Sequence, residues 1–338
     1  MNILFYTYPT AFQNPGGGET VLLKTKKHLK NLGCQVDLFN LWETKINDYD
    51  IIHCFASSTY PFWFEVKNFK KKLVVTPTLY PYTNIGTILK SMTKYYLKKY
   101  VFKKHYTWSS ERAFHLVDKF TVPSRAEADA LRKNFLLPED RFEIVPNGVD
   151  KKFYEKIDDR FRTKFKLKEY ILTVGRIVPN KNHLSLIRAC KSVKIPLVII
   201  GEPDANSADY FQKCKEEGKD NTIFAGYIPH DDPLLHSAYQ HCALFVLPSY
   251  RETCGMVAIE AGMAGTKVVI SDLLTIREYF RDYVEYINPG DINSIIEGIK
   301  NALRKTNNNN LQNHILWNFT WDKIAEKLLN VYSNIIRI

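Results

Sequence analysis

Val246-Leu-Pro-Ser-Tyr-Arg-Glu-Thr-Cys-Gly-Met-Val-Ala-Ile-Glu-Ala-Gly262 combines the end of an apolar strand, a polar turn and the start of a helix. The strand is predicted to end at Pro248, because proline has no N–H to donate to a continuing ladder. Gly255 allows the chain to bend, and Met256 to Ala261 suit a helix. Free N–H groups at that helix start would face the carboxyl end of the strand, which is where open α/β sheets bind phosphate-bearing ligands.

Two glutamates are the acidic residues of this stretch. Glu252 falls in the loop before the helix, and Glu260 is expected about two turns inside it. Two glutamates separated by seven residues can also have ordinary structural roles, in which Glu252 caps the helix and Glu260 is a solvated surface residue. The role of the pair therefore depends on the motifs that accompany it.

Composition limits the class of protein. The 338 residues are enough for two α/β domains. No apolar run reaches the length of a membrane span, and the first residues lack the features of a signal peptide. The six cysteines show no metal-binding spacing, so reduced thiols in the cytoplasm are expected. The net charge of +11 is uneven: the segment from Val66 to Ser110 has ten lysines and no acidic residue, which calls for an anionic partner such as membrane, nucleic acid or an acidic substrate.

A second anion-binding pattern lies near the start of the chain. Ile3 to Tyr8 is predicted as a buried strand, and a loop with Gly16, Gly17 and Gly18 leads into a helix from about Glu19 to Asn31. Such a loop directs backbone N–H groups toward an anion, aided by the helix dipole. The glycines do not follow the G-x-G-x-x-G spacing of dinucleotide binders, so by themselves they are a weak indication of phosphate binding.

The second half of the chain carries two cations in a similar setting. Tyr170 to Gly175 is predicted as a strand that leads to Arg176, and Lys181 lies just before a helix from about His183. A planar Arg fork and a mobile Lys charge suit a diphosphate, and the helix start adds roughly half a unit charge. No D-x-D pair presents itself as an obvious Mg²⁺ holder, so no metal is expected. The alternative is that both side chains are solvated surface cations.

In this order, the motifs resemble those of the retaining nucleotide-sugar glycosyltransferases of family 4, which have the GT-B fold. The resemblance covers most of the chain, and its specificity is concentrated in residues 170–265. The matching segments are the glycine loop, Asp50-Ile-Ile-His53, Pro123-Ser124, Pro146-Asn-Gly-Val-Asp150, V-G-R-x4-K at Arg176 and Lys181, and E-x7-E at Glu252 and Glu260.

The resemblance implies a donor site formed mainly by the second half of the chain. Arg176 and Lys181 would touch the donor diphosphate and act in catalysis. Glu252, also assigned to catalysis, would approach the hydroxyls of the transferred sugar, and Glu260 would bind the ribose. The further donor contacts that the resemblance implies are Gly17, Gly18, Tyr227, Ile228, Gly255, Met256 and Val257.

One segment departs from the family pattern. The strand from Lys72 to Thr78 ends in Thr-Pro-Thr, where many relatives have T-x-H with the histidine beside the transferred sugar. This difference is consistent with a different donor sugar. His53 and Thr78 are expected on the acceptor or sugar side of the site. For His53 the alternative is a hydrogen-bonded structural residue.

A lysine-rich helix is predicted from Ile88 to Lys104. Its apolar and aromatic side chains share one face, and Lys90, Lys94 and Lys98 lie opposite. Such a helix can lie on an anionic membrane surface, where each lysine contributes about 1 kcal/mol. The alternative is that the apolar face packs on the domain core. Tyrosines among lysines also suit single-stranded nucleic acid, but no nucleic-acid module accompanies them, so no such partner is expected.

The sequence thus predicts an α/β protein with the GT-B fold, in which two Rossmann-like doubly wound domains face a central cleft. Residues 1–150 would form the acceptor-binding domain and residues 151–318 the nucleotide-sugar domain. Residues 319–338 would form a terminal helix that crosses back to the first domain. Asn307 to Asn310 is predicted as a polar loop.

The predicted reaction is retaining transfer of a hexose-type sugar from a UDP- or GDP-sugar, without a further cofactor. The acceptor would be a glycan or lipid-linked molecule of cell-envelope polysaccharide or lipopolysaccharide synthesis. The expected location is the cytoplasm, peripheral on the inner face of the membrane. The alternatives are a GT-B nucleotide-sugar epimerase or hydrolase, and a non-catalytic basic protein that binds nucleic acid.

Overall fold

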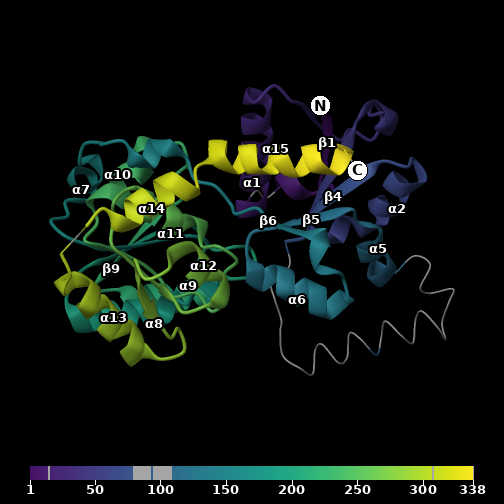
Figure 1. Ribbon diagram of the computed structural model, residues 1–338. Helices are drawn as coiled ribbons and strands as arrows, with labels where there is room; N and C mark the ends of the chain where they lie inside the picture. Colours follow the sequence, from purple (N-terminus) through teal and green to yellow (C-terminus); the bar gives the residue numbers. More distant parts are fainter. Residues whose placement is uncertain (14–15, 79–92, 94–108, 307, 338) are drawn as a thin grey trace. The chain divides into compact units, whose positions relative to one another are not determined.

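The computed structural model describes residues 1–13, 16–78, 93, 109–306 and 308–337. The chain divides into two compact units. Unit 1 combines Met1–Gly148 with Trp321–Ile338, and unit 2 is Val149–Thr320. Each unit has its own six-stranded sheet with helices around it (Figure 1).

The sheet of unit 1 is parallel throughout, in the order β2-β1-β3-β4-β5-β6. Its strands are apolar on both faces, as expected for a parallel sheet covered by helices on either side. The strands are β1 (Asn2–Tyr6), β2 (Gln35–Leu38), β3 (Ile51–Phe55), β4 (Lys72–Thr76), β5 (Lys119–Val122) and β6 (Phe142–Ile144). The described helices are α1 (Gly17–Asn31), α2 (Tyr60–Asn68), α5 (Ser110–Leu116), α6 (Arg125–Phe135) and α15 (Trp321–Arg337).

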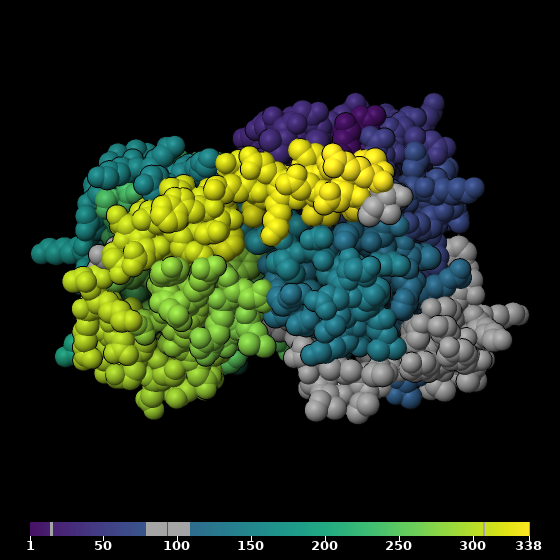
Figure 2. Space-filling model, in the orientation of Figure 1, coloured from purple at the N-terminus to yellow at the C-terminus, as the bar shows by residue number. Residues whose placement is uncertain are grey.

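The last helix, α15, belongs to the core of unit 1. Leu328 and Tyr332 lie in one buried cluster with Leu22 and Leu29 of α1. This face follows the helical spacing of apolar residues along α15, and Figure 2 shows the opposite face, in yellow, at the molecular surface. The predicted return of the terminal helix to the N-terminal domain is therefore confirmed.

Unit 2 has a second parallel sheet, in the order β12-β11-β10-β7-β8-β9. This order is the one of doubly wound nucleotide-binding folds. The strands are β7 (Ile171–Val174), β8 (Leu197–Ile200), β9 (Thr222–Gly226), β10 (Leu244–Leu247), β11 (Val268–Ser271) and β12 (Glu285–Ile287). The helices are α7 (Arg160–Phe165), α8 (His183–Val193), α9 (Ala208–Gly218), α10 (Pro233–His241), α11 (Met256–Met263), α12 (Leu274–Phe280), α13 (Ile292–Arg304) and α14 (Asn310–Asn318).

Short 3-10 helices connect these elements in both units. They are η1 (Ala11–Gln13), η2 (Ile46–Asp48), η3 (Ser57–Thr59), η5 (Glu139–Arg141), η6 (Lys151–Tyr154) and η7 (Pro179–Lys181).

The two Rossmann-like domains are as predicted. Asn308 and Asn309 lie outside the helices, as the predicted polar loop requires, but Asn310 already begins α14, because Leu311 and Ile315 pack into the core of unit 2. The lysine-rich segment with Lys90, Lys94 and Lys98 lies outside the described residues. Among the helices that the structure describes, none combines the length and the apolar character needed to cross a membrane.

His53 joins α15 to the sheet of unit 1. Its Nδ1 lies 2.5 Å from the hydroxyl of Tyr332, and its Nε2 lies 2.8 Å from Oγ1 of Thr76. Burial lowers the pKa of His53 to about 3, so the ring stays neutral and needs one donor and one acceptor as partners.

Replacing Tyr332 by Phe removes the partner of Nδ1 and leaves a buried polar atom without a hydrogen bond. We expect Tyr332→Phe to lower the free energy of unfolding by about 1–3 kcal/mol. Urea denaturation at pH 7 measures this loss. Asn334→Ala, on the exposed face of the same helix, is the control and should change stability by less than about 0.5 kcal/mol. Equal stability of the two variants would contradict a structural role for the contact.

Candidate active site

The sheet of unit 2 reverses its winding between β7 and β10. From β7 the chain continues through β8 to β9 on one side, and from β10 through β11 to β12 on the other. In an open parallel sheet, a ligand binds beyond the carboxyl ends of the strands at such a reversal. The loop after β7 carries Arg176 and Lys181, and the loop after β10 carries Glu252. These three residues were predicted to be catalytic.

Two glycines shape the loop after β7. Gly175 and Gly201 have φ angles of 145° and 142°, a region that side chains rarely occupy. A Cβ on Gly201 would lie 2.1 Å from the carbonyl oxygen of Gly175, so only glycine fits there. The chain therefore turns directly after β7, and Arg176 follows as an exposed residue.

Hydrogen bonds connect the loops after β7 and β10. The N–H of Tyr250 donates to the carbonyl of Asn180 over 2.9 Å, and the Asn180 amide donates to the carbonyl of Arg251 over 3.1 Å. The ammonium of Lys181 forms an ion pair with Oε1 of Glu252. Both side chains are mostly buried, with 22% and 11% of their surface exposed. The structure therefore holds the predicted cation and the predicted carboxylate together.

The N-terminus of α11 lies just beyond Glu252. Gly255 is its N-cap in the left-handed conformation, with φ 64°, and the N–H groups of Ala258 and Ile259 donate to its carbonyl. Met256 and Val257 are the first two residues of the helix, and the first N–H groups of a helix have no acceptor within it. The predicted backbone contacts are thus at a helix start that can accept an anion.

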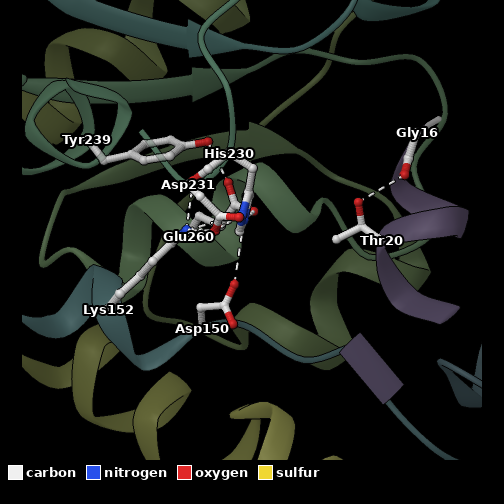
Figure 3. Close-up of polar contacts among 8 residues, drawn as sticks. All are labelled: Gly16, Thr20, Asp150, Lys152, His230, Asp231, Tyr239 and Glu260. Atoms are coloured by element: carbon white, nitrogen blue, oxygen red, sulfur yellow. Dashed lines mark hydrogen bonds and ion pairs between the residues drawn. The ribbon is translucent and has the colours of Figure 1, made fainter. Parts of the chain in front are cut away.

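Glu260 is the fifth residue of α11, closer to the helix start than the two turns expected. Only 6% of the residue is exposed. The hydroxyl of Tyr239 donates to its Oε2 over 2.7 Å, and Nε2 of His230 lies 3.2 Å from its Oε1 (Figure 3). Burial and the Glu260 charge raise the pKa of Tyr239 well above its usual value, so the phenol stays a donor.

Around His230, the structure gathers further charges that sequence reasoning missed. Oxygens of Asp150 and Asp231 and the nitrogens of His230 lie within 4.8 Å of one another, a set that could hold a metal ion. However, Lys152 places its ammonium 2.6 Å from Asp231 and 3.2 Å from Nδ1 of His230 (Figure 3). The lysine supplies the positive charge at this position, so the donor set fits a metal ion poorly.

The sequence offered only a weak signal for these residues. His230 stands in Pro229-His230-Asp231-Asp232, a polar turn before α10, and Tyr239 sits among apolar residues of that helix. Neither pattern indicates a partnership with Glu260.

The residues after β9 differ in exposure. Tyr227 is 67% exposed, while Ile228 is 7% exposed and packs in the core of unit 2. Gly226 precedes them with φ 73°. Of the two residues predicted to border the base, Tyr227 presents its side chain to the surface, and Ile228 offers mainly its backbone.

In unit 1, the glycine loop leads directly into α1. Gly17 and Gly18 are the first residues of the helix, and Thr20 bonds the carbonyl of Gly16 through its N–H and its hydroxyl (Figure 3). The buried carboxylate of Glu19 accepts from the N–H of Gly16 over 2.7 Å and from the hydroxyl of Tyr8. Glu19 therefore fixes the loop and brings a negative charge to the start of the helix, which the sequence analysis did not anticipate.

The two residues predicted on the acceptor side lie in different surroundings. His53 is 1% exposed, and its ring nitrogens contact Tyr332 and Thr76. Thr78 is exposed, with a φ of 44° that is uncommon for a residue with a side chain. The structure thus gives His53 structural contacts, and contact with a substrate remains a prediction for both residues.

Comparison with protein families gives two matches that follow one another along the chain. Residues 40–153 match the model "Glycosyltransferase Family 4", and residues 155–315 match "Glycosyl transferases group 1". The chain belongs to the family 4 glycosyltransferases. The first matched region falls mostly in unit 1 and the second lies in unit 2.

Two curated relatives illustrate the range of this family. An uncharacterized glycosyltransferase of Methanocaldococcus jannaschii is 30% identical over 222 residues, which are 59% of this chain and 55% of the relative. The O-antigen chain mannosyltransferase RfbU of Salmonella typhimurium is 26% identical over 214 residues, which are 61% of this chain and 56% of the relative. The chain thus spans about half the length of these curated relatives.

Solved structures share the fold over the whole chain. Sucrose-phosphate synthase from Thermosynechococcus elongatus has a TM-score of 0.78 at 18% identity, with both chains covered completely. Anabaena HepE, solved in complex with UDP and glucose, has a TM-score of 0.77 at 15% identity, covering 99% of this chain and 100% of that one. At these identities the likeness establishes the GT-B fold.

The contact between Gly175 and Gly201 gives a stability prediction with a matched control. Gly201→Ala and Gly226→Ala both place a side chain at positive φ, but only Gly201 meets a backbone atom, since nothing lies within 4 Å of a Cβ on Gly226. We expect Gly201→Ala to destabilise unit 2 by about 2 kcal/mol more than Gly226→Ala. Thermal and urea unfolding of both variants measure the difference, and similar values would show that the close approach is unimportant.

Proposed function

We propose that this protein is a retaining glycosyltransferase that moves a hexose-type sugar from a UDP- or GDP-sugar to a glycan or lipid-linked acceptor. The observation that carries the proposal is the ion pair of Lys181 and Glu252 at the point where the sheet of unit 2 reverses. It joins residues from two motifs that are 71 positions apart. Family membership supports the reaction class.

In this proposal, the donor diphosphate lies against the cations of unit 2. Arg176 is exposed just beyond β7 and, in the described part of the chain, has no carboxylate at ion-pair distance. Lys181 uses its ammonium for Glu252 but has three N–H groups, so it can also donate to phosphate oxygens. The N-terminus of α11 adds N–H donors and a partial positive charge.

Catalysis would come from charge that is already in position. As the bond from the anomeric carbon to the diphosphate breaks, negative charge grows on the leaving phosphate, and fixed donors stabilise it without reorganisation. Lys181 is held by Glu252 before any ligand arrives, so its position is prepared in advance. The acceptor hydroxyl would attack from the face that the diphosphate leaves, and its proton would pass to the leaving phosphate, which gives retention.

The remaining donor contacts follow the family assignments. Glu252 would accept hydroxyls of the transferred sugar through the oxygen that does not bond Lys181, and Glu260 would accept ribose hydroxyls. Tyr227 and the backbone of Ile228 would border the base. Gly17 and Gly18 would donate backbone N–H groups to the diphosphate.

The acceptor is proposed to belong to cell-envelope polysaccharide or lipopolysaccharide synthesis at the inner face of the membrane. RfbU, one of the relatives, acts on O-antigen chains by its name. The ten lysines between Val66 and Ser110 support attraction to an anionic lipid surface. His53 and Thr78 remain the proposed acceptor-side residues.

Removing the exposed guanidinium tests the proposed role of the cations. We expect Arg176→Ala to lower turnover by about 10²–10³-fold, as for the loss of a single donor to a developing oxyanion. Transfer is measured by release of the nucleoside diphosphate with saturating donor and acceptor. Arg188→Ala is the control, because this exposed arginine of α8 pairs with Glu217 and should leave turnover unchanged.

The donor is identified first, by thermal shift with UDP-, GDP-, ADP- and dTDP-sugars. Stabilisation by one nucleotide class, followed by transfer only when acceptor is added, is the expected result. Consumption of donor alone would indicate an epimerase or hydrolase instead. Near-normal transfer by an Arg176→Ala/Lys181→Ala double variant would refute the assignment of these two cations to the donor diphosphate.

A further inference from the structure

The carboxylate of Glu260 is buried but only partly occupied by protein donors. Tyr239 donates to Oε2 over 2.7 Å, and His230 approaches Oε1 at 3.2 Å. Each carboxylate oxygen can accept about two hydrogen bonds. One acceptor position is therefore left on each oxygen, which matches the two adjacent hydroxyls of a ribose ring.

His230 is itself held from several directions. Lys152 donates to the carbonyl of His230 over 2.7 Å and places its ammonium 3.2 Å from Nδ1. Asp231 lies 3.4 Å from Nδ1, and Asp150 lies 3.8 Å from Nε2. The ring of Phe153 meets the imidazole edge to face, with centroids 5.4 Å apart. The imidazole therefore has a defined orientation toward Glu260, although 30% of its side chain is exposed.

We propose that His230 is a positioning residue that, together with Tyr239, fixes the Glu260 carboxylate for the two ribose hydroxyls of the donor. This inference rests on the proposed function, in which Glu260 binds the ribose. Without the bond from His230, the carboxylate can rotate about its terminal torsion and lose the arrangement that matches both hydroxyls. A donor nucleotide that lacks the 2′-hydroxyl gains less from this arrangement than a ribonucleotide does.

Protonation of His230 strengthens the arrangement. In the neutral ring, Nε2–H can donate to Glu260 while Nδ1 accepts from Lys152. In the imidazolium both nitrogens donate, Nε2 to Glu260 and Nδ1 to Asp231. The added positive charge partly neutralises the negative charge of the Glu260 carboxylate. Burial lowers the pKa of His230, and the charge of Lys152 lowers it further. The hydrogen bond to Glu260 and the charges of Glu260 and Asp150 raise it. The raising contributions are larger, so the pKa of His230 lies above its usual value of 6.5.

The direction of the pH effect follows from this charge. An anionic donor binds more tightly to the form that carries the extra proton, so its affinity is complete below the pKa of His230. It declines as the pH rises through that value, in a window above pH 6.5.

The test measures binding of UDP, GDP and their 2′-deoxy counterparts to the full chain by calorimetry between pH 6 and 9. We expect His230→Ala to weaken binding of the preferred ribonucleotide about tenfold, the size expected for losing a hydrogen bond to a charged group. The preference over the 2′-deoxy form should shrink in parallel. In transfer assays, KM for the donor should rise more than kcat falls.

His230→Gln keeps an N–H donor but does not titrate. It should recover most of the affinity that His230→Ala loses, and its binding should not change over the pH window. His241→Ala is the matched control, since Nε2 of this α10 histidine contacts a backbone carbonyl, that of Ile157, over 3.0 Å. Thermal unfolding of all variants verifies that they are folded.

Three results would overturn the inference. Affinity of His230→Ala within twofold of wild type would show that the imidazole does not position Glu260. A His230→Gln variant as weak as His230→Ala would show that the bond to Glu260 is not the basis of the effect. If the wild-type protein bound none of the four nucleotides, the proposed function would fail and this inference with it, whereas the first two results leave that function intact.

Discussion

The ion pair of Lys181 and Glu252 joins the loops that follow β7 and β10, at the point where the sheet of unit 2 reverses. Both side chains are mostly buried, and a buried charge that loses its partner is costly. Neither loop can therefore move alone without exposing one of these charges to solvent or leaving it buried without its partner. The backbone bonds between Asn180 and Tyr250 keep the same two loops in register. Because the pair forms without any ligand, a cation and a carboxylate are already in place where the sheet opens.

The same rule applies to two further buried carboxylates, those of Glu19 and Glu260. Glu19 is satisfied by the Tyr8 hydroxyl and the N–H of Gly16, and Glu260 accepts from Tyr239 and His230. Removal of a carboxylate from water requires such donors. The Glu19 charge offsets the positive end of the α1 dipole. If the glycine loop binds an anion as proposed, it would therefore contribute N–H hydrogen bonds rather than net positive charge.

Much of the fold could be predicted because it depends on local patterns. Continuous apolar runs such as Phe245 to Leu247 indicate buried parallel strands, and the glycine and proline residues after them indicate where the chain turns. The spacing of Glu252 and Glu260 alone left their role open, and the resemblance to the family's E-x7-E motif pointed to them. The pairing of Lys181 with Glu252 could not be predicted, since it depends on which strands are neighbours in the sheet.

The contacts of His230 could not be predicted from the sequence, for the same reason. Thirty positions separate it from Glu260, and a histidine in a polar turn has no periodic pattern that reveals its partner. Glu19 was missed because its role as a cap depends on the backbone of the glycine loop. α14 was missed because its helix depends on packing against α11, where Gly262 lies close to Leu311 and Ile315.

The charges of unit 2 explain how an acidic set of residues can accept an anionic ligand. Lys181 matches Glu252, and Lys152 lies against Asp231, so these charges largely cancel within the protein. Among the residues that the structure describes, His230 is the basic group in contact with Glu260, and it offsets the carboxylate charge when the imidazole is protonated. In the proposed function, the exposed Arg176 and the start of α11 would be the positive groups that a diphosphate meets. Loss of the His230 proton would then return one negative charge to the site, so a titrating side chain behind Glu260 would affect the binding of the whole nucleotide.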